Sequence, residues 1–90
     1  MTSIKKQFVI QNKLGLHARP VAMFVKCSNR FESDITVEKN NETVNGKSIM
    51  GMMMLAAGEG SKVTVIATGS DASEALQEIE KLINNKFGEE

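Results

Sequence analysis

The sequence predicts an α+β fold in which a four-stranded, mainly antiparallel sheet has helices packed on one face. Two observations lead to this expectation. Short segments alternate apolar and polar residues with the period of half-buried strands, whereas longer segments repeat apolar residues at helical spacing. A chain of 90 residues can build one modest core, so we expect residues 1–90 to form a single domain in the order β-α-β-β-α-β-α.

Four segments carry strand signals. They are residues 5–11, 34–39, 42–45 and 62–68. Asn40 and Asn41 separate the second segment from the third, and asparagine tolerates the positive φ angles of a tight turn, which predicts a hairpin. The side chains expected to face the core are Phe8, Ile10, Ile35, Val37, Val63, Val65 and Ala67.

Three helices are predicted. The first covers residues 18–29, with Pro20 in its first turn, where the missing N–H costs least. The second is a short methionine-rich helix over residues 49–56, with Ser48 as its N-cap. A capping box of Asp71 and Glu74 opens the third. Its apolar face repeats at Ala72, Leu76, Ile79, Ile83 and Phe87.

The composition argues against several function classes. Eleven basic and 11 acidic side chains give a net charge of zero, and the chain has no Trp or Tyr, which argues against a nucleic-acid-binding surface. The single cysteine excludes an internal disulfide and fits a reducing compartment. No apolar run is long enough for a signal peptide or a membrane span. We therefore expect a cytoplasmic protein without nucleic-acid or membrane partners.

The histidine at position 17 is the only one in the chain, and it precedes the first predicted helix. Unpaired N–H groups and the positive end of the helix dipole make such a place favourable for phosphate. His17 could accept a phosphoryl group, with Arg19 nearby as a partner for it, or it could act as a general base. No carboxylate lies near His17 in the sequence, although a distant one could fold back. An ordinary surface histidine remains the alternative to all of these roles.

A metal or cofactor site is not expected. Besides His17, the chain offers one cysteine, Cys27, which would lie about 15 Å further along the helix. Cys27 falls off the main apolar face of that helix, so it is expected to be an ordinary helix residue without a reactive thiolate.

The methionine-rich helix cannot bury all its apolar side chains on one side. Met52 and Leu55 share a face and are expected in the core, whereas Met50, Met53 and Met54 spread over the other faces. Exposed methionines suit a surface that accepts several partners. Met23 falls opposite the apolar face of the first helix and is a second candidate for exposure near the histidine.

The chain resembles HPr, the histidine-containing phosphocarrier of the bacterial phosphoenolpyruvate:sugar phosphotransferase system, at two motifs. These are Gly15-Leu16-His17-Ala18-Arg19-Pro20 and Asn45-Gly46-Lys47-Ser48-Ile49-Met50-Gly51. The resemblance covers essentially the whole chain. It implies an open-faced β-sandwich, with a four-stranded antiparallel sheet and three helices on one side.

The resemblance also implies a function. Enzyme I would phosphorylate His17 on Nδ1, and the phosphoryl group would pass to EIIA domains. Arg19 would stabilise the phosphoryl group, and the backbone N–H of Ala18 would contact it. Ser48 matches a serine that HPr kinase/phosphorylase modifies in many bacteria, which in some lineages creates a corepressor for a catabolite-control regulator. The implied docking surface consists of Ala22, Met23, Ile49, Met50 and Met53.

The sequence departs from the family pattern at Met54, where many relatives carry Ser or Thr, and at Ala56, where glycine is frequent. These changes make the implied docking surface more apolar. We expect a monomeric carrier that is not an autonomous enzyme. The alternative is a purely regulatory protein of carbon metabolism, acting through phosphorylation of Ser48 and partner binding.

Overall fold

The computed structural model describes residues 2–89 and has the expected order of elements. Their bounds are β1 Ser3–Val9, α1 Ala18–Ser28, β2 Asp34–Lys39, β3 Glu42–Asn45, α2 Ile49–Met54, β4 Lys62–Thr68, α3 Ala72–Asn84 and the 3₁₀ turn η1 Lys86–Gly88. Three of the four expected strands have the predicted bounds. The first instead begins and ends two residues earlier.

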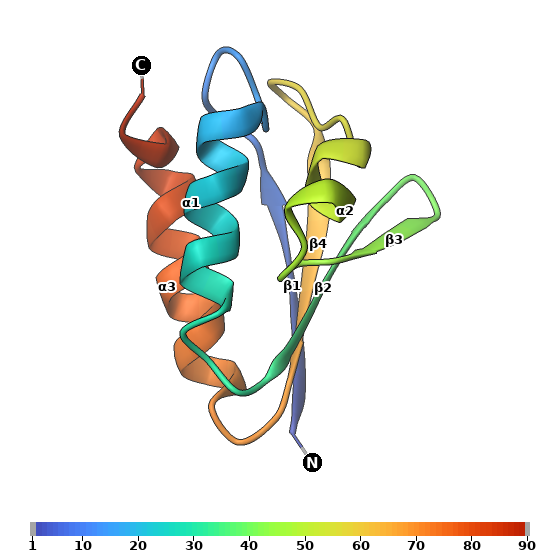
Figure 1. Cartoon of the computed structure of the whole chain (residues 1–90), viewed down its shortest axis with the longest axis vertical. Helices are drawn as coiled ribbons and strands as arrows, with labels where there is room; N and C mark the ends of the chain where they lie inside the picture. Colours follow the sequence, from blue (N-terminus) through green and yellow to red (C-terminus); the bar gives the residue numbers. More distant parts are fainter. Residues whose placement is uncertain (1, 90) are drawn as a thin grey trace.

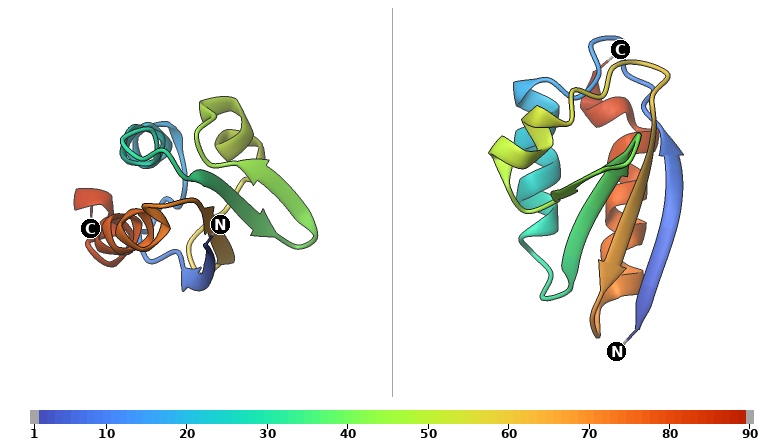
Figure 2. Two further views of the ribbon diagram at one scale, coloured as in Figure 1. Left: turned by 90° about the horizontal axis from the view of Figure 1, so that it is seen from below. Right: turned by 90° about the vertical axis from the view of Figure 1, so that its right-hand side faces the viewer.

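The sheet is antiparallel, with strand order β1-β4-β2-β3, so that the first and last strands of the sequence are neighbours (Figure 1). The β2–β3 hairpin turns at Asn40 and Asn41, whose φ angles are 49° and 70°. This confirms the predicted turn. Figure 2 shows the helices gathered on one side of the sheet, which confirms the open-faced arrangement.

The core lies between the sheet and the helices. Alternate residues of β2 and β4 face it, and they are fully buried, as their period of two predicts. From the helices, Val21, Phe24 and Ile79 are at most 2% exposed. This packing holds α1, α3 and the segments at their ends rigidly enough to position a site.

The predicted capping box before α3 is wrong. The Asp71 side chain makes no cap hydrogen bond to α3. Its carboxylate instead accepts hydrogen bonds from the backbone N–H of Glu32 (3.0 Å) and of Ser33 (2.9 Å), and from the Ser33 hydroxyl. The Ser33 hydroxyl, followed by the backbone N–H groups, holds the pKa of Asp71 below its ordinary value of 3.8. Asp71 therefore fastens the loop after α1 to the start of α3.

The end of the last helix also differs from the prediction. α3 ends at Asn84, and Lys86 and Phe87 adopt φ angles of 52° and 53°. Phe87 is nevertheless 1% exposed, so the turn directs its ring back into the core. The apolar repeat identified a core residue correctly but assigned it to the wrong backbone conformation.

Candidate functional site

His17 is the N-cap of α1, as predicted. Its backbone is extended (φ −89°, ψ −170°), and its carbonyl accepts a hydrogen bond from the N–H of Val21 at 3.0 Å. The imidazole makes no capping hydrogen bond. The ring is therefore available for other contacts at the positive end of the helix dipole.

The loop before His17 is fixed by the segment that follows α2. Gly15 has φ +68°, and the N–H of Leu16 donates to the Ala57 carbonyl at 2.7 Å. A Cβ atom on Gly15 would lie 2.5 Å from that carbonyl oxygen. Only glycine combines the left-handed conformation with this close approach, which explains why position 15 of the motif is a glycine.

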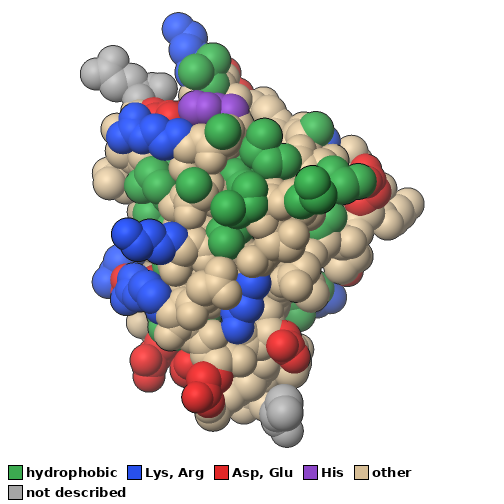
Figure 3. All heavy atoms as spheres, viewed as in Figure 1, with side chains coloured by type: hydrophobic (Ala, Val, Ile, Leu, Met, Phe, Trp, Pro, Cys, Tyr) green, Lys and Arg blue, Asp and Glu red, His purple; other side chains and the backbone are tan. Residues whose placement is uncertain are grey.

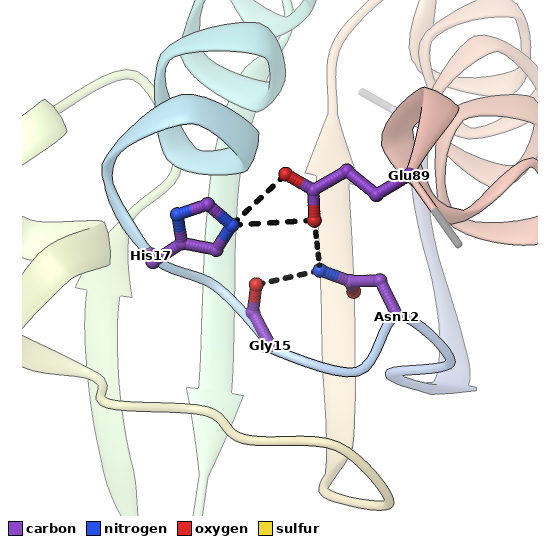
Figure 4. Close-up of polar contacts among 4 residues, drawn as sticks. All are labelled: Asn12, Gly15, His17 and Glu89. Atoms are coloured by element: carbon purple, nitrogen blue, oxygen red, sulfur yellow. Dashed lines mark hydrogen bonds and ion pairs between the residues drawn. The ribbon is translucent and has the colours of Figure 1, made fainter.

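A carboxylate distant in the sequence does fold back onto the histidine. The Glu89 carboxylate oxygens lie 2.9 and 3.2 Å from His17 Nε2. The fully buried side chain of Asn12 donates from Nδ2 to Glu89 Oε1 at 3.0 Å and to the Gly15 carbonyl at 2.7 Å (Figure 4). Asn12 thus links the carboxylate to the loop. Sequence reasoning identified neither Asn12 nor Glu89. Glu89 is 72 positions from His17, and the role of Asn12 at this site depends on its contact with Glu89.

This contact determines which ring nitrogen is free. An ionised carboxylate only accepts hydrogen bonds, so Nε2 must carry the proton in the contact with Glu89. In a neutral imidazole the other nitrogen, Nδ1, then keeps its lone pair. Nδ1 lies on the side of the ring away from Glu89 (Figure 4). With 37% of the His17 side chain exposed, the ring can meet another molecule.

Ala18 and Arg19 are the exposed residues in the first turn of α1. Pro20 has no N–H, and the N–H of Val21 is used by His17, which leaves the N–H groups of Ala18 and Arg19 at the helix start. Within residues 2–89, Arg19 makes no ion pair. The first turn of α1 also contains no acidic side chain. These groups of α1 favour an anion, whereas the only nearby carboxylate described above, that of Glu89, lies at Nε2 of the ring.

An exposed apolar patch formed by α2 lies beside α1 (Figure 3). The chain's histidine is at the upper edge of this patch in the figure. The exposed side chains of α2 are Ile49 (55%), Met50 (75%), Met53 (43%) and Met54 (70%). Met52 and Leu55 are at most 2% exposed, which confirms the predicted split between core and surface.

Two residues of α1 differ from their expected environments. Met23 is half-buried and packs against the core rather than standing free near the histidine, whereas Ala22 is exposed. Cys27 is 6% exposed and belongs to the core. The helical pattern missed both because α3 covers this side of α1 and extends the apolar face. Burial raises the pKa of the Cys27 thiol above 9.0, so the thiol is not activated.

Ser48 is the N-cap of α2, as predicted. Its hydroxyl accepts a hydrogen bond from the N–H of Gly51 at 3.0 Å, and its carbonyl accepts one from Met52 at 3.0 Å. The side chain is half-buried. As the N-cap, Ser48 lies directly before the exposed Ile49 and Met50.

No group of three or more potential metal ligands occurs in the part of the chain that the structure describes. Within residues 2–89, no helix is both long and apolar enough to cross a membrane.

The family model described as "PTS HPr component phosphorylation site" matches residues 4–85. The chain belongs to the HPr family. It is 46% identical over 86 residues to the phosphocarrier protein HPr of Neisseria meningitidis serogroup A, across 96% of this chain and 97% of that protein. It is 47% identical over 76 residues to the HPr-like protein Crh of Bacillus subtilis, across 84% of this chain and 89% of Crh. HPr membership places the chain among the components of the phosphotransferase system.

Solved structures agree with the fold. HPr-C-His from Thermoanaerobacter tengcongensis is 48% identical, with a TM-score of 0.94 over 97% of this chain and 98% of that one. An HPr dimer from the same organism is 50% identical, with a TM-score of 0.79 over 91% and 94% of the two chains. A similar HPr thus occurs as a dimer, in contrast to the monomer expected for this chain.

Proposed function

We propose that residues 1–90 form a single phosphocarrier domain that accepts a phosphoryl group on Nδ1 of His17 from phospho-enzyme I and passes it to EIIA domains. The observation that supports this most directly is the free Nδ1 of a partly exposed imidazole at the N-cap of α1. The protein is a cytoplasmic monomer and a covalent intermediate in the relay rather than an autonomous enzyme. It needs no cofactor.

The surroundings of Nδ1 suit a phosphoryl group. The N–H of Ala18 and the guanidinium of Arg19 are donors at the positive end of α1, and hydrogen bonds from charged donors to phosphate are the stronger kind. Each step of the relay also needs docking. The exposed apolar side chains of α2 supply a surface that can fit more than one partner, since methionine adapts its shape to different neighbours. The proposed docking residues are Ala22, Met23, Ile49, Met50 and Met53.

The test is phosphoryl transfer from phosphoenolpyruvate with purified enzyme I, followed by mass mapping of the label. We expect one acid-labile phosphoryl group on His17 and none on a His17→Ala variant. Because the His17 ring is partly exposed and makes no cap bond, the variant should keep the circular dichroism spectrum and melting temperature of the parent. Acid-labile label on the folded variant, or none on the parent with a competent enzyme I, would refute the assignment.

The second candidate function is regulation through Ser48. The likeness to Crh supports it, as does the position of Ser48 at the start of the helix that carries the exposed methionines. HPr kinase/phosphorylase would add up to about two negative charges beside this apolar surface and thereby disfavour docking of enzyme I. The phosphorylated form would bind a catabolite-control regulator.

This regulatory role is tested with Ser48→Asp and with Ser48→Ala as its uncharged control. We expect Ser48→Asp to slow acceptance from enzyme I with little loss of stability, and Ser48→Ala to slow it much less. Equal transfer rates for the two variants would remove the proposed switch.

A further inference from the structure

We infer that Glu89 is a positioning residue that keeps His17 protonated on Nε2, so that Nδ1 can accept and release a phosphoryl group without a proton transfer at the ring. This inference rests on the carrier function proposed above. The contacts that support it join Glu89, His17 and Asn12 (Figure 4).

Three observations indicate that the Glu89 carboxylate is fixed in position. Only 15% of the Glu89 side chain is exposed. One of its oxygens accepts a hydrogen bond from the fully buried Asn12 side chain, which is itself bound to the loop before His17. Two residues before Glu89, the buried ring of Phe87 fixes the backbone. The ring of His17 therefore meets an acceptor that is already oriented.

Acceptance needs only the lone pair of Nδ1. This pair attacks phosphorus, the Nδ1–P bond forms, and the bond between phosphorus and the donor group of enzyme I breaks with its electron pair returning to that group. The His17 ring keeps its Nε2 proton and becomes positively charged. The Glu89 carboxylate balances this charge at 2.9 Å, as a buried carboxylate does for an imidazolium in a catalytic triad.

Release runs through the same ring state. The Nδ1–P bond breaks, its electron pair returns to Nδ1, and the leaving group is a neutral imidazole that still carries its Nε2 proton. If Nε2 lost its proton, the leaving group would be an anionic imidazolate, which departs poorly. One carboxylate contact therefore serves both directions of the relay, which a carrier requires because it must be charged and discharged equally well.

The test compares the parent with Glu89→Ala, which removes both the acceptor and the charge, and Glu89→Gln, which keeps an acceptor oxygen without the charge. Glu74→Gln, an exposed carboxylate in the first turn of α3, is the matched control. Since none of these changes removes a buried apolar side chain, all four proteins should fold. The histidine is the only one in the chain, so its ring ¹⁵N resonances are unambiguous.

We expect the ring ¹⁵N resonances of the parent and of Glu74→Gln to report the Nε2–H tautomer in the neutral form of the ring. Glu89→Ala should populate the Nδ1–H form. Its kcat for acceptance from phospho-enzyme I should fall about tenfold, the size expected for a lost charge-assisted hydrogen bond, with KM nearly unchanged. Glu89→Gln should lie between Glu89→Ala and the parent.

Two outcomes are distinguishable. A parent that takes label on His17 while Glu89→Ala shows the same tautomer and the same kcat would overturn the role of Glu89 and leave the carrier function standing. A parent that takes no label would overturn the carrier function, and the positioning role with it.

Discussion

The short helix α2 is held by very few side chains, and this predicts opposite behaviour for two neighbouring methionines. Met52 is the only buried residue of α2, at 0% exposure, whereas Met50 is 75% exposed. Truncating a fully buried methionine to alanine costs about 2–5 kcal/mol through lost burial and the cavity left behind. Met50→Ala removes surface that is already in water and should change stability by less than about 0.5 kcal/mol.

These magnitudes can be resolved by urea unfolding. Domains have a free energy of unfolding of about 0.05–0.15 kcal/mol per residue, which for this chain gives roughly 5–13 kcal/mol. With a parent stability near the middle of this range, about 9 kcal/mol, Met52→Ala should remain folded in buffer. With an m-value of about 1–3 kcal/mol/M, a loss of about 2–5 kcal/mol should lower its midpoint by about 0.7–5 M, while that of Met50→Ala stays near the parent. Because α2 would be loosened first, its amides should also exchange faster in Met52→Ala.

The two variants should separate stability from docking. Met50→Ala should weaken the proposed docking to enzyme I without a stability change. Similar midpoints for Met52→Ala and Met50→Ala would refute the assignment of Met52 as the residue that anchors α2.

Three further predictions follow from other contacts. Hydrogen bonds lower the pKa of Asp71, so its stabilisation is present above the unfolded value near 3.8 and is lost as pH falls through the lower folded value. Asp71→Asn should therefore be less stable than the parent at pH 7 in urea unfolding, and the difference should shrink on acidification; a constant difference would contradict this. Burial raises the pKa of Cys27, so a thiol reagent should react slowly with the folded protein and rapidly in denaturing urea, whereas equal rates would show that the thiol is accessible. Gly15→Ala should lower stability by at least about 1–2 kcal/mol in thermal melts, because alanine is strained at φ +68° and meets the Ala57 carbonyl; an unchanged melting temperature would rule out this close approach.

Most of the fold could be predicted because its signals are local. Alternation predicted the bounds of β2 and β4, two asparagines marked the hairpin whose second arm is β3, and Ser48 marked the start of α2. The place of His17 at the start of α1 followed from Pro20 and the apolar spacing behind it. These features depend on neighbours a few residues away, so the sequence contains all the information they need.

The features that could not be predicted depend on tertiary contacts. Asp71 has the spacing of a capping box, yet it binds the loop at Glu32 and Ser33, which only the fold brings near. Phe87 continues the apolar period of α3 while its backbone has already left the helix. The contact of Glu89 with His17 closes a loop of more than 70 residues, and no local pattern reports such a partner.

The strand order has a consequence for the order in which the newly made chain can fold. β1 is synthesised first, but it lies at the sheet edge and its partner in the sheet is β4, with Ser3 opposite Thr68. At a synthesis rate of about 5–20 residues per second, β1 waits several seconds on the ribosome for its partner. Lys5 and Lys6 keep this waiting strand charged, which discourages pairing with other nascent chains. Because Glu89 follows β4 in the chain, the contact around His17 can form only after all four strands have been synthesised.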